Sequence, residues 1–405
     1  ENFNLEGIGK PLVRIRDLLS DTLPTFYDGD DGGDFIVKNG DIVIGMDGDF
    51  NSVTWSKGEA LLNQRVCALR AKQNSGVDAR ILGYQIPISL KIINDLTPWS
   101  TVKHLSSLDV LSLRFPKFDP TTQGKIVEFL DHETASVDNL IQKKKRQVEL
   151  LREKQKSFAA EEVTGANNSE KSGTGLGQLP FAPSHWRVHR VATVFRESFE
   201  MGGKELPVLS VSINWGISDR ELDDEDRHRI VTHIEDRNAY KRVRVGDLVY
   251  NMMRAWQGGF GVAKVDGLVS PAYVVARPSE EIHAPFFEHL LRTPMWIEEF
   301  RRSSKGIADF RQRLYWEHFR QVGLVLPPLE EQVEIANRIA ANDAAIEAAL
   351  TPIQVSIERL AEFRSALITS AVTGQIDVET WGKEGNTDRR LDQIEEEMSL
   401  REARA

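Results

Sequence analysis

The chain has 405 residues, of which 40% are hydrophobic and 28% are charged, and its formal net charge is −10. These values are typical of a globular protein with two or three domains. The single cysteine, Cys67, excludes an internal disulfide and indicates a reducing, cytoplasmic compartment, while the lack of an 18-residue apolar stretch or a signal peptide argues against membrane insertion and secretion.

The first predicted domain covers residues 1–117 and carries the pattern of short strands. The run VKNGDIVI at residues 37–44 is followed by a glycine-rich stretch and another apolar run, which predicts strands joined by a hairpin. Leu111, Leu113 and Phe115 then alternate with other residues and predict a short strand leading into a helix.

A long amphipathic helix is predicted over residues 118–166, because apolar residues recur at the a and d positions of a heptad. Lys144 and Gln155 occupy two positions where apolar residues are expected, and such polar breaks can fix the register of a coiled coil. The a and d residues of this helix are Leu130, Val137, Ile141, Val148, Leu151 and Phe158.

The run after this helix is rich in glycine and serine and predicts a flexible linker over residues 167–179. A second mixed domain is predicted over residues 180–326, where VRVGDLVY at 243–250 faintly repeats residues 37–44. Val243 lies 63 positions after Pro180, whereas only 36 residues precede Val37. The segment before the matching strand is therefore expected to be shorter in the first domain.

Residues 327–378 predict a second long helix that repeats the first. Shifting the first helix by 209 positions matches its VTG ending, residues 163–165, with the VTG at residues 372–374. Pro352 lies inside the run and predicts a kink near Leu350. The a and d residues here are Ile339, Ile346, Leu350, Ile353, Ile357, Leu360 and Leu367. A long helix with one apolar stripe must pack that stripe against another apolar surface. The nearest such surface is the stripe of the other long helix in the same chain. In the acidic tail, residues 379–405, the Glu395 to Glu397 run is expected to be a solvated helix face.

The two repeated helices, together with several motifs, resemble the DNA-specificity subunit of a type I restriction-modification enzyme. The motifs are LPPLEEQ, LAEFRSALITSAVTGQIDV, GDIVIGMDGDF, LLNQRV and GLVSPAY, and the match spans about residues 10 to 378. FPKFDPTTQ departs from LPPLEEQ by two extra residues between proline and glutamine. The resemblance implies an α+β fold, in which two mixed α/β target-recognition domains are separated by two long helices that pair as an antiparallel coiled coil.

The resemblance also implies a function. Each mixed domain would read one half of a split sequence in double-stranded DNA, and the helices would space the domains and hold the methyltransferase subunits. A rigid spacer suits this task, because a flexible tether would leave the distance between half-sites undefined. A motor-nuclease subunit would complete a restriction complex. S-adenosylmethionine, Mg²⁺ and ATP would bind those partners and not this chain. The alternative is a coiled-coil module that binds protein only.

The negative net charge is not spread evenly along the chain. Residues 180–326 hold 21 Lys and Arg against 20 Asp and Glu, whereas residues 327–405 hold 8 against 16, so the acidic excess lies outside the second domain. One stretch of that domain, RRSSKGIADFRQR, combines phosphate donors with a glycine and an aromatic residue. Its cations are Arg301, Arg302, Lys305, Arg311 and Arg313. The alternative is an ordinary solvated helix and loop.

Base edges are read by side chains with paired donors and acceptors, chiefly Arg, Lys, Asn and Gln. In the second domain such residues follow a predicted strand and precede Gly258. They are Asn251, Arg254 and Gln257, with Trp256 among them. The matching candidates in the first domain are Asn51, Gln64 and Arg65. The alternatives are that Asp47-Gly48-Asp49 is only a turn, and that Gln64 and Arg65 are satisfied inside a strand.

No catalytic or metal-binding motif emerges from the sequence. It contains no phosphate loop of the form GxxxxGK[ST], no target-base loop resembling Asn-Pro-Pro-Tyr and no dinucleotide fingerprint. His185 and His189 are four residues apart, but they lie in an extended segment without a supporting cysteine and are expected to be surface residues. The chain is therefore predicted to be non-catalytic and to depend on partners for catalysis.

Overall fold

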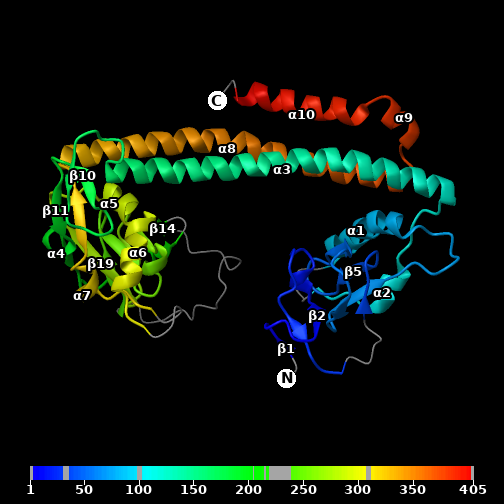
Figure 1. Ribbon diagram of the computed structural model, residues 1–405, viewed down its shortest axis with the longest axis horizontal. Coiled ribbons are helices and arrows are strands. Elements are labelled where there is room, and N and C mark those ends of the chain that lie inside the picture. The colour runs from blue at the N-terminus through cyan, green and yellow to red at the C-terminus, as the bar shows by residue number, and fades with distance from the viewer. Residues whose placement is uncertain are drawn as a thin grey trace. The chain divides into compact units, whose positions relative to one another are not determined.

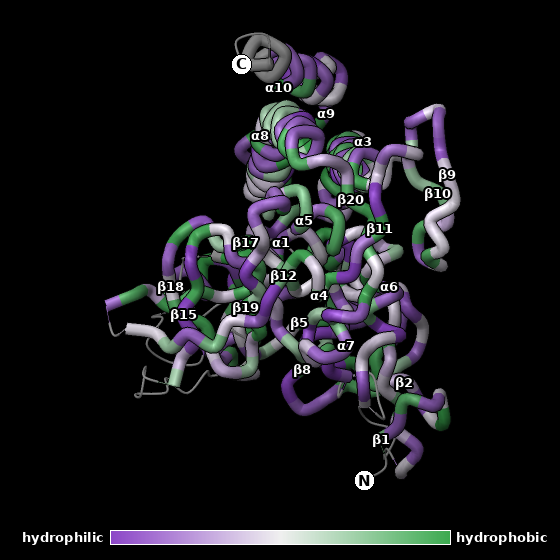
Figure 2. Tube along the Cα trace, turned by 90° about the vertical axis from the view of Figure 1, so that its left-hand side faces the viewer, coloured by the Kyte–Doolittle hydropathy of each residue, from purple (hydrophilic) through white to green (hydrophobic). Residues whose placement is uncertain are grey.

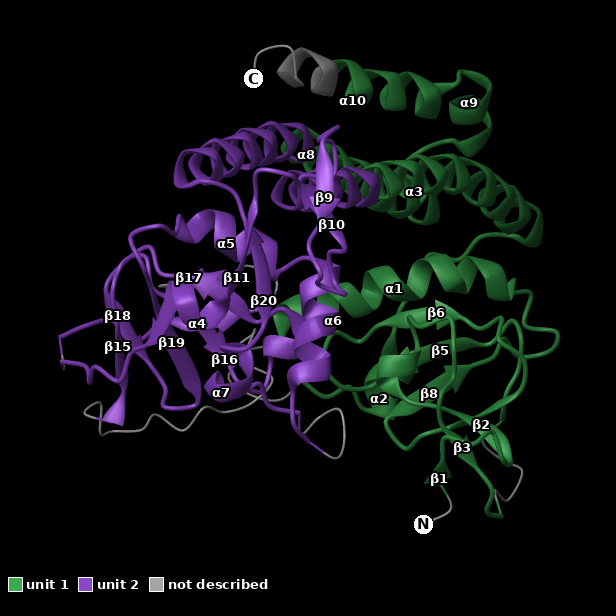
Figure 3. Ribbon diagram, turned by 60° about the vertical axis from the view of Figure 1, so that its left-hand side comes forward, with its two compact units in different colours: residues 1–148, 351–405 green, residues 149–350 purple. Residues whose placement is uncertain are grey.

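The computed structural model describes residues 3–30, 36–97, 103–203, 205–213, 216–218, 239–306 and 312–402. The chain divides into two compact units, which Figure 3 colours separately. Unit 1 comprises residues 1–148 and 351–405, and unit 2 comprises residues 149–350. The division falls inside both long helices, so each unit contains one end of each helix.

Unit 1 contains two small sheets, two shorter helices and a helical C-terminal segment. Its elements besides the long helices are β1 (Phe3–Asn4), β2 (Lys10–Val13), the 3-10 helix η1 (Ile15–Asp17), β3 (Phe26–Tyr27), β4 (Ile36–Val37), β5 (Ile42–Gly45), β6 (Ser52–Thr54), β7 (Ala60–Leu62), β8 (Val66–Leu69), α1 (Ala79–Leu96), α2 (Ser107–Ser112), α9 (Val378–Lys383) and α10 (Asn386–Glu402). The sheets have the strand orders β1-β3-β2-β7-β4 and β6-β5-β8. Helix α1 packs on the second sheet, where Ile86 and Leu90 are buried with Ile42 and Ile44 of β5.

Unit 2 is built around a four-stranded antiparallel sheet in the order β12-β19-β16-β17. Its elements are β9 (Lys171–Gly173), β10 (Phe181–Pro183), β11 (Arg187–Arg190), α4 (Val191–Val194), β12 (Phe195–Glu197), β13 (Ser210–Ser212), β14 (Gly216–Ser218), β15 (Lys241–Val243), β16 (Leu248–Asn251), the 3-10 helix η4 (Ala255–Gln257), β17 (Phe260–Val262), β18 (Gly267–Val269), β19 (Tyr273–Pro278), α5 (Ala284–Leu291), α6 (Pro294–Ser303), α7 (Trp316–Phe319) and β20 (Gly323–Leu326). Helices α6 and α7 pack on this sheet through rings, because Phe300 and Phe319 lie 4.9 and 5.7 Å from Phe260. These buried rings fix the position of the segments around β16 and β17.

The long helices are α3 (Pro120–Thr164) and α8 (Leu329–Val372), which Figure 1 shows side by side. In unit 1, Val137 packs with Leu360, and Leu130, seven residues earlier, packs with Leu367. The residue number on α8 therefore rises as that on α3 falls, which is antiparallel packing.

Unit 2 shows the same antiparallel order. Arg152 of α3 donates to Glu347 of α8 at 3.2 Å, and Arg338 of α8 donates to Glu162 of α3 at 2.8 Å. The predicted fold class, α+β with two long helices paired antiparallel, is confirmed.

Most of the predicted a and d residues lie on the buried side of the helices. Leu130, Val137, Ile141, Ile339, Ile346, Leu350, Ile353, Leu360 and Leu367 are buried, and Val148, Leu151, Phe158 and Ile357 are half-buried. The polar break at Gln155 donates to Asp343 of α8 at 3.0 Å, and Lys144 lies 3.9 Å from Glu395 of α10. Helix α8 continues through Pro352, which is buried inside it.

The repeated VTG motif ends each long helix in the same way. Gly165 and Gly374 have φ angles of +62° and +73°, in the left-handed region that favours glycine. The N–H of the residue after each glycine donates to the carbonyl five positions earlier, at 2.9 Å for Ala166 and 2.8 Å for Gln375. This pattern is the Schellman motif, so the repeated motif is explained by helix termination.

A buried glutamine near the start of α3 joins this helix to the loop before α1. Gln123 accepts from the backbone N–H of Asp78 at 2.7 Å and donates to the carbonyls of Gly76 and Phe118, each at 2.8 Å. Asp78 is the N-cap of α1, so one side chain fixes the junction of two helices.

The equivalent glutamine of α8, 209 positions later, makes the equivalent contacts in unit 2. Gln332 accepts from the N–H of His283, the N-cap residue of α5, at 2.9 Å. It donates to the carbonyls of Glu281 and Pro327 at 3.1 and 3.0 Å. The match between the two halves therefore extends from the sequence to individual hydrogen bonds.

Replacing this glutamine by alanine is expected to destabilise the fold. Gln332→Ala leaves the N–H of His283 and the carbonyls of Glu281 and Pro327 without this partner, and an unsatisfied buried group costs about 1–3 kcal/mol. We expect the free energy of unfolding in urea to fall by at least that amount. Gln354→Ala, at an exposed position of the same helix, is the control and should change it by less than about 0.5 kcal/mol. Equal effects of the two variants would contradict this role.

The strand predicted before the first long helix is wrong. Leu111 belongs to α2, and residues 113–119 form no strand. The second half differs because β20 pairs with β11, which supplies hydrogen-bond partners for its backbone. No described strand pairs with residues 113–115, so their backbone makes no strand-to-strand hydrogen bonds. The side chains of Leu113 and Phe115 nevertheless lie against the core of unit 1.

The predicted linker is more ordered, and the predicted acidic tail is more buried, than the sequence suggests. Within the predicted linker, residues 171–173 form β9 and pair with β10. The acidic tail forms α9 and α10, and Ile394 of α10 is buried with Val137, Ile141 and Leu360 of the long helices. The coloured part of α10 in Figure 2 includes hydrophilic residues, and Glu395 and Glu396 are exposed as expected. The tail therefore adds a third helix to the long pair within unit 1.

Candidate nucleic-acid interface

An aspartate clamps the same turn in both units. In unit 1, Asp41 accepts from the N–H of Lys38 at 2.8 Å and from Nε of Arg70 at 2.6 Å. Burial acts to raise the pKa of Asp41, but the hydrogen bonds from Arg70 and Lys38 outweigh it, so the pKa lies below its usual value. The carboxylate is thus held ionised, and the stability it contributes is lost only as the pH falls through the lowered pKa.

In unit 2, Asp247 makes the matching contacts. It accepts from the N–H of Arg244 at 2.9 Å and from Nε and Nη2 of Arg277, both at 2.9 Å. The side-chain hydrogen bond to Asp247 raises the pKa of Arg277. In each unit the aspartate holds the turn just before a central strand, β5 or β16. It therefore fixes the position of that strand and of the residues that follow its C-terminal end.

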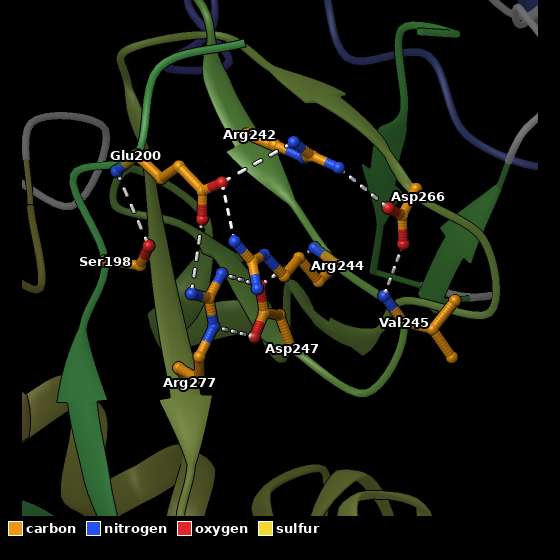
Figure 4. A network of polar contacts seen from close by, with 8 residues as sticks. All are labelled: Ser198, Glu200, Arg242, Arg244, Val245, Asp247, Asp266 and Arg277. Carbon is orange, nitrogen blue, oxygen red and sulfur yellow. Dashed lines mark hydrogen bonds and ion pairs between the residues drawn. The ribbon is translucent and has the colours of Figure 1, made fainter.

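The arginines around this clamp in unit 2 are balanced by carboxylates, as Figure 4 shows. Glu200 accepts from Arg244 at 2.8 Å and from Arg277 at 3.3 Å, while Arg242 lies 3.3 Å from Asp266. The hydrogen bond from Arg244 lowers the pKa of Glu200. The sequence did not predict this network, because its members come from the segment after β12, from β15, from β19 and from two turns. Since its charges cancel, it positions strands and adds little to a basic surface.

The predicted base-reading residues of the second domain lie at the far end of β16. Asn251 ends the strand and its side chain accepts from the N–H of Met253 at 2.9 Å. Arg254 is exposed and donates to Gln257 of η4 at 3.2 Å. Gly258, with a φ of +90°, then turns the chain into β17.

The basic stretch of the second domain lies beside these residues. The guanidinium of Arg301 lies 5.8 Å from the ring of Trp256, and the backbones of Lys305 and Arg313 exchange hydrogen bonds of 3.0 and 2.9 Å. The next residue, Leu314, donates to the carbonyl of Met252 at 2.9 Å and so docks this pair onto the end of β16. The fold thus brings together residues that are about 60 positions apart in the sequence.

The cations of this group are available to an anionic ligand. Arg254, Arg301, Lys305 and Arg313 are exposed, and only Arg301 is ion-paired to a carboxylate among the described residues, 3.3 Å from Glu298. Arg302 is also exposed and lies 3.6 Å from Glu298. Exposed cations beside an aromatic ring suit a phosphate backbone. The predicted contact Arg311 lies outside the described residues.

In the first domain, the candidate residues surround the end of β5. Gln64 and Arg65 are exposed in the turn between β7 and β8, so they are not satisfied inside a strand. Asn51 is half-buried and its carbonyl accepts from the N–H of Gly45 at 2.9 Å. Arg65 lies 3.6 Å from Asp47, which in turn contacts His104 at 2.6 Å. His104 was not among the predicted residues, because only the fold places it beside Asp47.

Catalytic and metal-binding arrangements are not evident in the described part of the chain. No group of three or more potential metal ligands occurs among the residues that the structure describes. His185 is 2.8 Å from Glu331, whereas His189 lies in β11, so the two histidines do not form a pair of ligands. No helix within the described ranges is long and apolar enough to cross a membrane.

Comparisons with known proteins agree with this architecture. Residues 25–150 match the family described as the type I restriction modification DNA specificity domain. Over 391 residues the chain is 27% identical to the type I restriction enzyme EcoBI specificity subunit of Escherichia coli, covering 92% of this chain and 81% of that protein.

Two solved structures are also similar. A chain from a study of complex assembly and conformational transition of the type I R-M system matches with a TM-score of 0.56 and 15% identity, covering 91% of this chain and 92% of that one. The HsdS subunit from Thermoanaerobacter tengcongensis matches with a TM-score of 0.41 and 16% identity, covering 91% of each chain. The family match over residues 25–150 and the relative that spans 92% of the chain show that this sequence is similar, over most of its length, to the specificity subunits of type I restriction-modification enzymes.

Proposed function

We propose that the two mixed domains each read one half of a split site in double-stranded DNA, as the non-catalytic subunit of a type I complex. One observation carries this assignment. In both domains a clamped central strand ends at a group of exposed polar side chains, and each domain leads directly into a long helix. Two readers built alike and joined by paired helices suit a bipartite target.

The residues of the second domain divide by the kind of contact they suit. Arg301, Lys305 and Arg313 are exposed cations and suit phosphates, which position the protein without specifying sequence. Arg254 and Gln257 carry the paired donors and acceptors that suit base edges. They sit at the start and end of η4, between β16 and β17, and a major groove admits a two-stranded ribbon.

The first domain has fewer cations at the corresponding place and is proposed to contribute mainly base contacts. Arg65 and Gln64 are exposed there and Asn51 is half-buried, while Asp47 adds a negative charge. The second domain would then supply the larger share of the electrostatic attraction to DNA.

The long helices are proposed to hold the methyltransferase subunits and to set the spacing of the half-sites. Their contacts with each other bury the a and d residues, so partners would bind the remaining faces. A motor-nuclease subunit would join through this methyltransferase assembly. S-adenosylmethionine, Mg²⁺ and ATP are proposed to bind those partners, where the chemistry takes place.

Exchange of one domain should change one half-site only. We expect replacement of residues 180–326 by the equivalent region of another specificity subunit to alter one half of the methylated sequence, because each domain has its own core and clamp. The measurement is methylome sequencing of cells that express the chimera with its methyltransferase. The reciprocal exchange of residues 1–117 is the control and should alter the other half. A chimera that changed both halves, or neither, would rule out modular reading.

A binding measurement separates this function from a module that binds protein only. The chain, alone and with its methyltransferase, is titrated with random duplexes in a filter-binding assay. DNA recognition predicts retention of duplex that weakens with salt. If the assembled complex retained no duplex at low salt, the protein-binding alternative would be correct.

A further inference from the structure

The end of the central strand is built alike in the two domains. In unit 1, Leu105 donates to the carbonyl of Met46 at 2.7 Å, just beyond β5. In unit 2, Leu314 donates to the carbonyl of Met252 at 2.9 Å, just beyond β16. His104 therefore occupies the place in the first domain that Arg313 occupies in the second.

Three side chains with hydrogen-bonding groups converge at this place in unit 1. Nδ1 of His104 lies 2.6 Å from Oδ1 of Asp47, and Nε of Arg65 lies 3.6 Å from Oδ2 of the same carboxylate. Nη1 of Arg65 is 3.4 Å from Nδ1 of His104. The exposed fractions of the side chains are 49% for His104, 27% for Asp47 and 51% for Arg65. All three are thus accessible to a ligand.

The contacts fix the donors and acceptors of the cluster. A carboxylate only accepts, so Nδ1 of His104 must carry the proton that it shares with Asp47. Nδ1 then has no lone pair for Arg65, whose contact with it is proximity only. Asp47 pairs with Arg65 at 3.6 Å on the Nε side, and the Arg65 side chain remains 51% exposed, so the parallel N–H donors of its guanidinium are accessible to a ligand. Two parallel N–H donors match O6 and N7 of guanine in the major groove.

This cluster differs from the structural aspartate clamp in the same unit. Asp41 has a side chain only 4% exposed and holds the N–H of Lys38, so the hairpin depends on it. Asp47 is more exposed: its carboxylate is hydrogen-bonded to His104 and ion-paired with Arg65, and no backbone N–H among the described residues donates to it. Its pairing with Arg65 is therefore not required to hold the fold, and it orients a side chain that faces outward.

We propose that Arg65 reads a guanine in the half-site of the first domain and that Asp47 is its positioning residue. This inference rests on the proposed function, since it names the base that one domain recognises. One positive and one negative charge add little general attraction to DNA. The cluster thus contributes specificity, while phosphate contacts supply affinity.

The test uses the full chain in complex with its methyltransferase. Arg65→Ala should lower discrimination at one G·C pair of the first half-site by about 5- to 150-fold, which corresponds to about 1–3 kcal/mol at 1.4 kcal/mol per tenfold. Asp47→Asn should lower it by a smaller factor, and the double variant should be no worse than Arg65→Ala, because the two residues act through one contact. Arg80→Ala is the matched control, since Arg80 is similarly exposed and paired with Asp78 at 2.8 Å. It should leave discrimination unchanged.

A modified base gives an independent readout. A duplex with 7-deazaguanine lacks the N7 acceptor, so it should weaken binding of the wild-type complex at that position but not of the Arg65→Ala complex. Retention of the second half-site shows that each variant is folded.

An unchanged first half-site in Arg65→Ala, a first half-site without a G·C pair, or equal weakening on every duplex would overturn the assignment of Arg65. A full effect of Asp47→Asn on a background of Arg65→Ala would overturn the role of Asp47. Failure of the proposed function would look different, because the wild-type complex would then show no sequence preference.

Discussion

Adding four residues to each long helix at facing positions is expected to lengthen the central spacer of the methylated site by one or two base pairs. Four residues extend a helix by about 6 Å at 1.5 Å per residue, and base pairs are about 3.4 Å apart. The insertions belong after Val148 and after Leu350, because the flanking contacts Asp138–Arg364 and Arg152–Glu347 place these points opposite each other in the antiparallel pair.

The measurement is methylome sequencing, which returns the half-sites and their spacing together. Both half-sites should be preserved, since neither domain is altered. A single insertion in α3 is the control, and it should weaken assembly because it slips buried residues such as Val137 out of register with Leu360. Methylation that persists with an unchanged spacer after the paired insertion would show that partner subunits, not these helices, set the spacing.

Removing three cations from the second domain should flatten the salt dependence of DNA binding. For the triple variant Arg301→Ala, Lys305→Ala and Arg313→Ala, we expect the slope of log K against log salt to fall in magnitude by about 2.7, at about 0.9 per phosphate contact. All sequences should lose affinity alike, because phosphates carry no sequence information. The measurement is duplex binding by the assembled complex over a range of salt concentrations.

A matched triple variant controls for the loss of positive charge itself. Arg187, Arg190 and Arg196 are exposed arginines of unit 2 on β11 and β12, away from the end of β16. Their replacement by alanine removes the same charge but no proposed phosphate contact, so the slope should stay close to that of the wild type. If the two triple variants changed the slope equally, the group around Trp256 would be an ordinary solvated surface.

Several features were predictable because they depend on residues close together in the chain. The heptad pattern predicted both long helices, since helical periodicity is local: three of their four ends lie within two residues of the prediction, and the second helix ends six residues early, at Val372. The VTG repeat marked both helix ends, because a glycine in the left-handed conformation closes a Schellman motif from five neighbouring residues. The strands after residues 37 and 243 followed likewise from alternation and glycine turns.

Other features depended on partners far along the chain. The alternation at Leu111 and Phe115 predicted a strand, but a strand forms only where a second one supplies hydrogen bonds, as β11 does for β20. The acidic tail looked solvated from its charges, yet Ile394 buries its apolar face on the long helices. The periodicity of apolar residues identifies which face of a helix is apolar, but it does not identify the element that packs against that face.

The sequence by itself determined the repeated plan of this protein, two mixed domains that are each followed by a long helix with an apolar seam, and the family that this plan resembles. Only the tertiary structure decided which polar residues meet. It placed Gln332 under the N-terminus of α5, Arg301 over Trp256, and His104 beside Asp47. The physical reason is the separation along the sequence of the residues that interact. Helices and turns form from neighbouring residues, whereas a hydrogen bond or ring contact joins side chains that only the packing of the whole unit brings within a few ångströms.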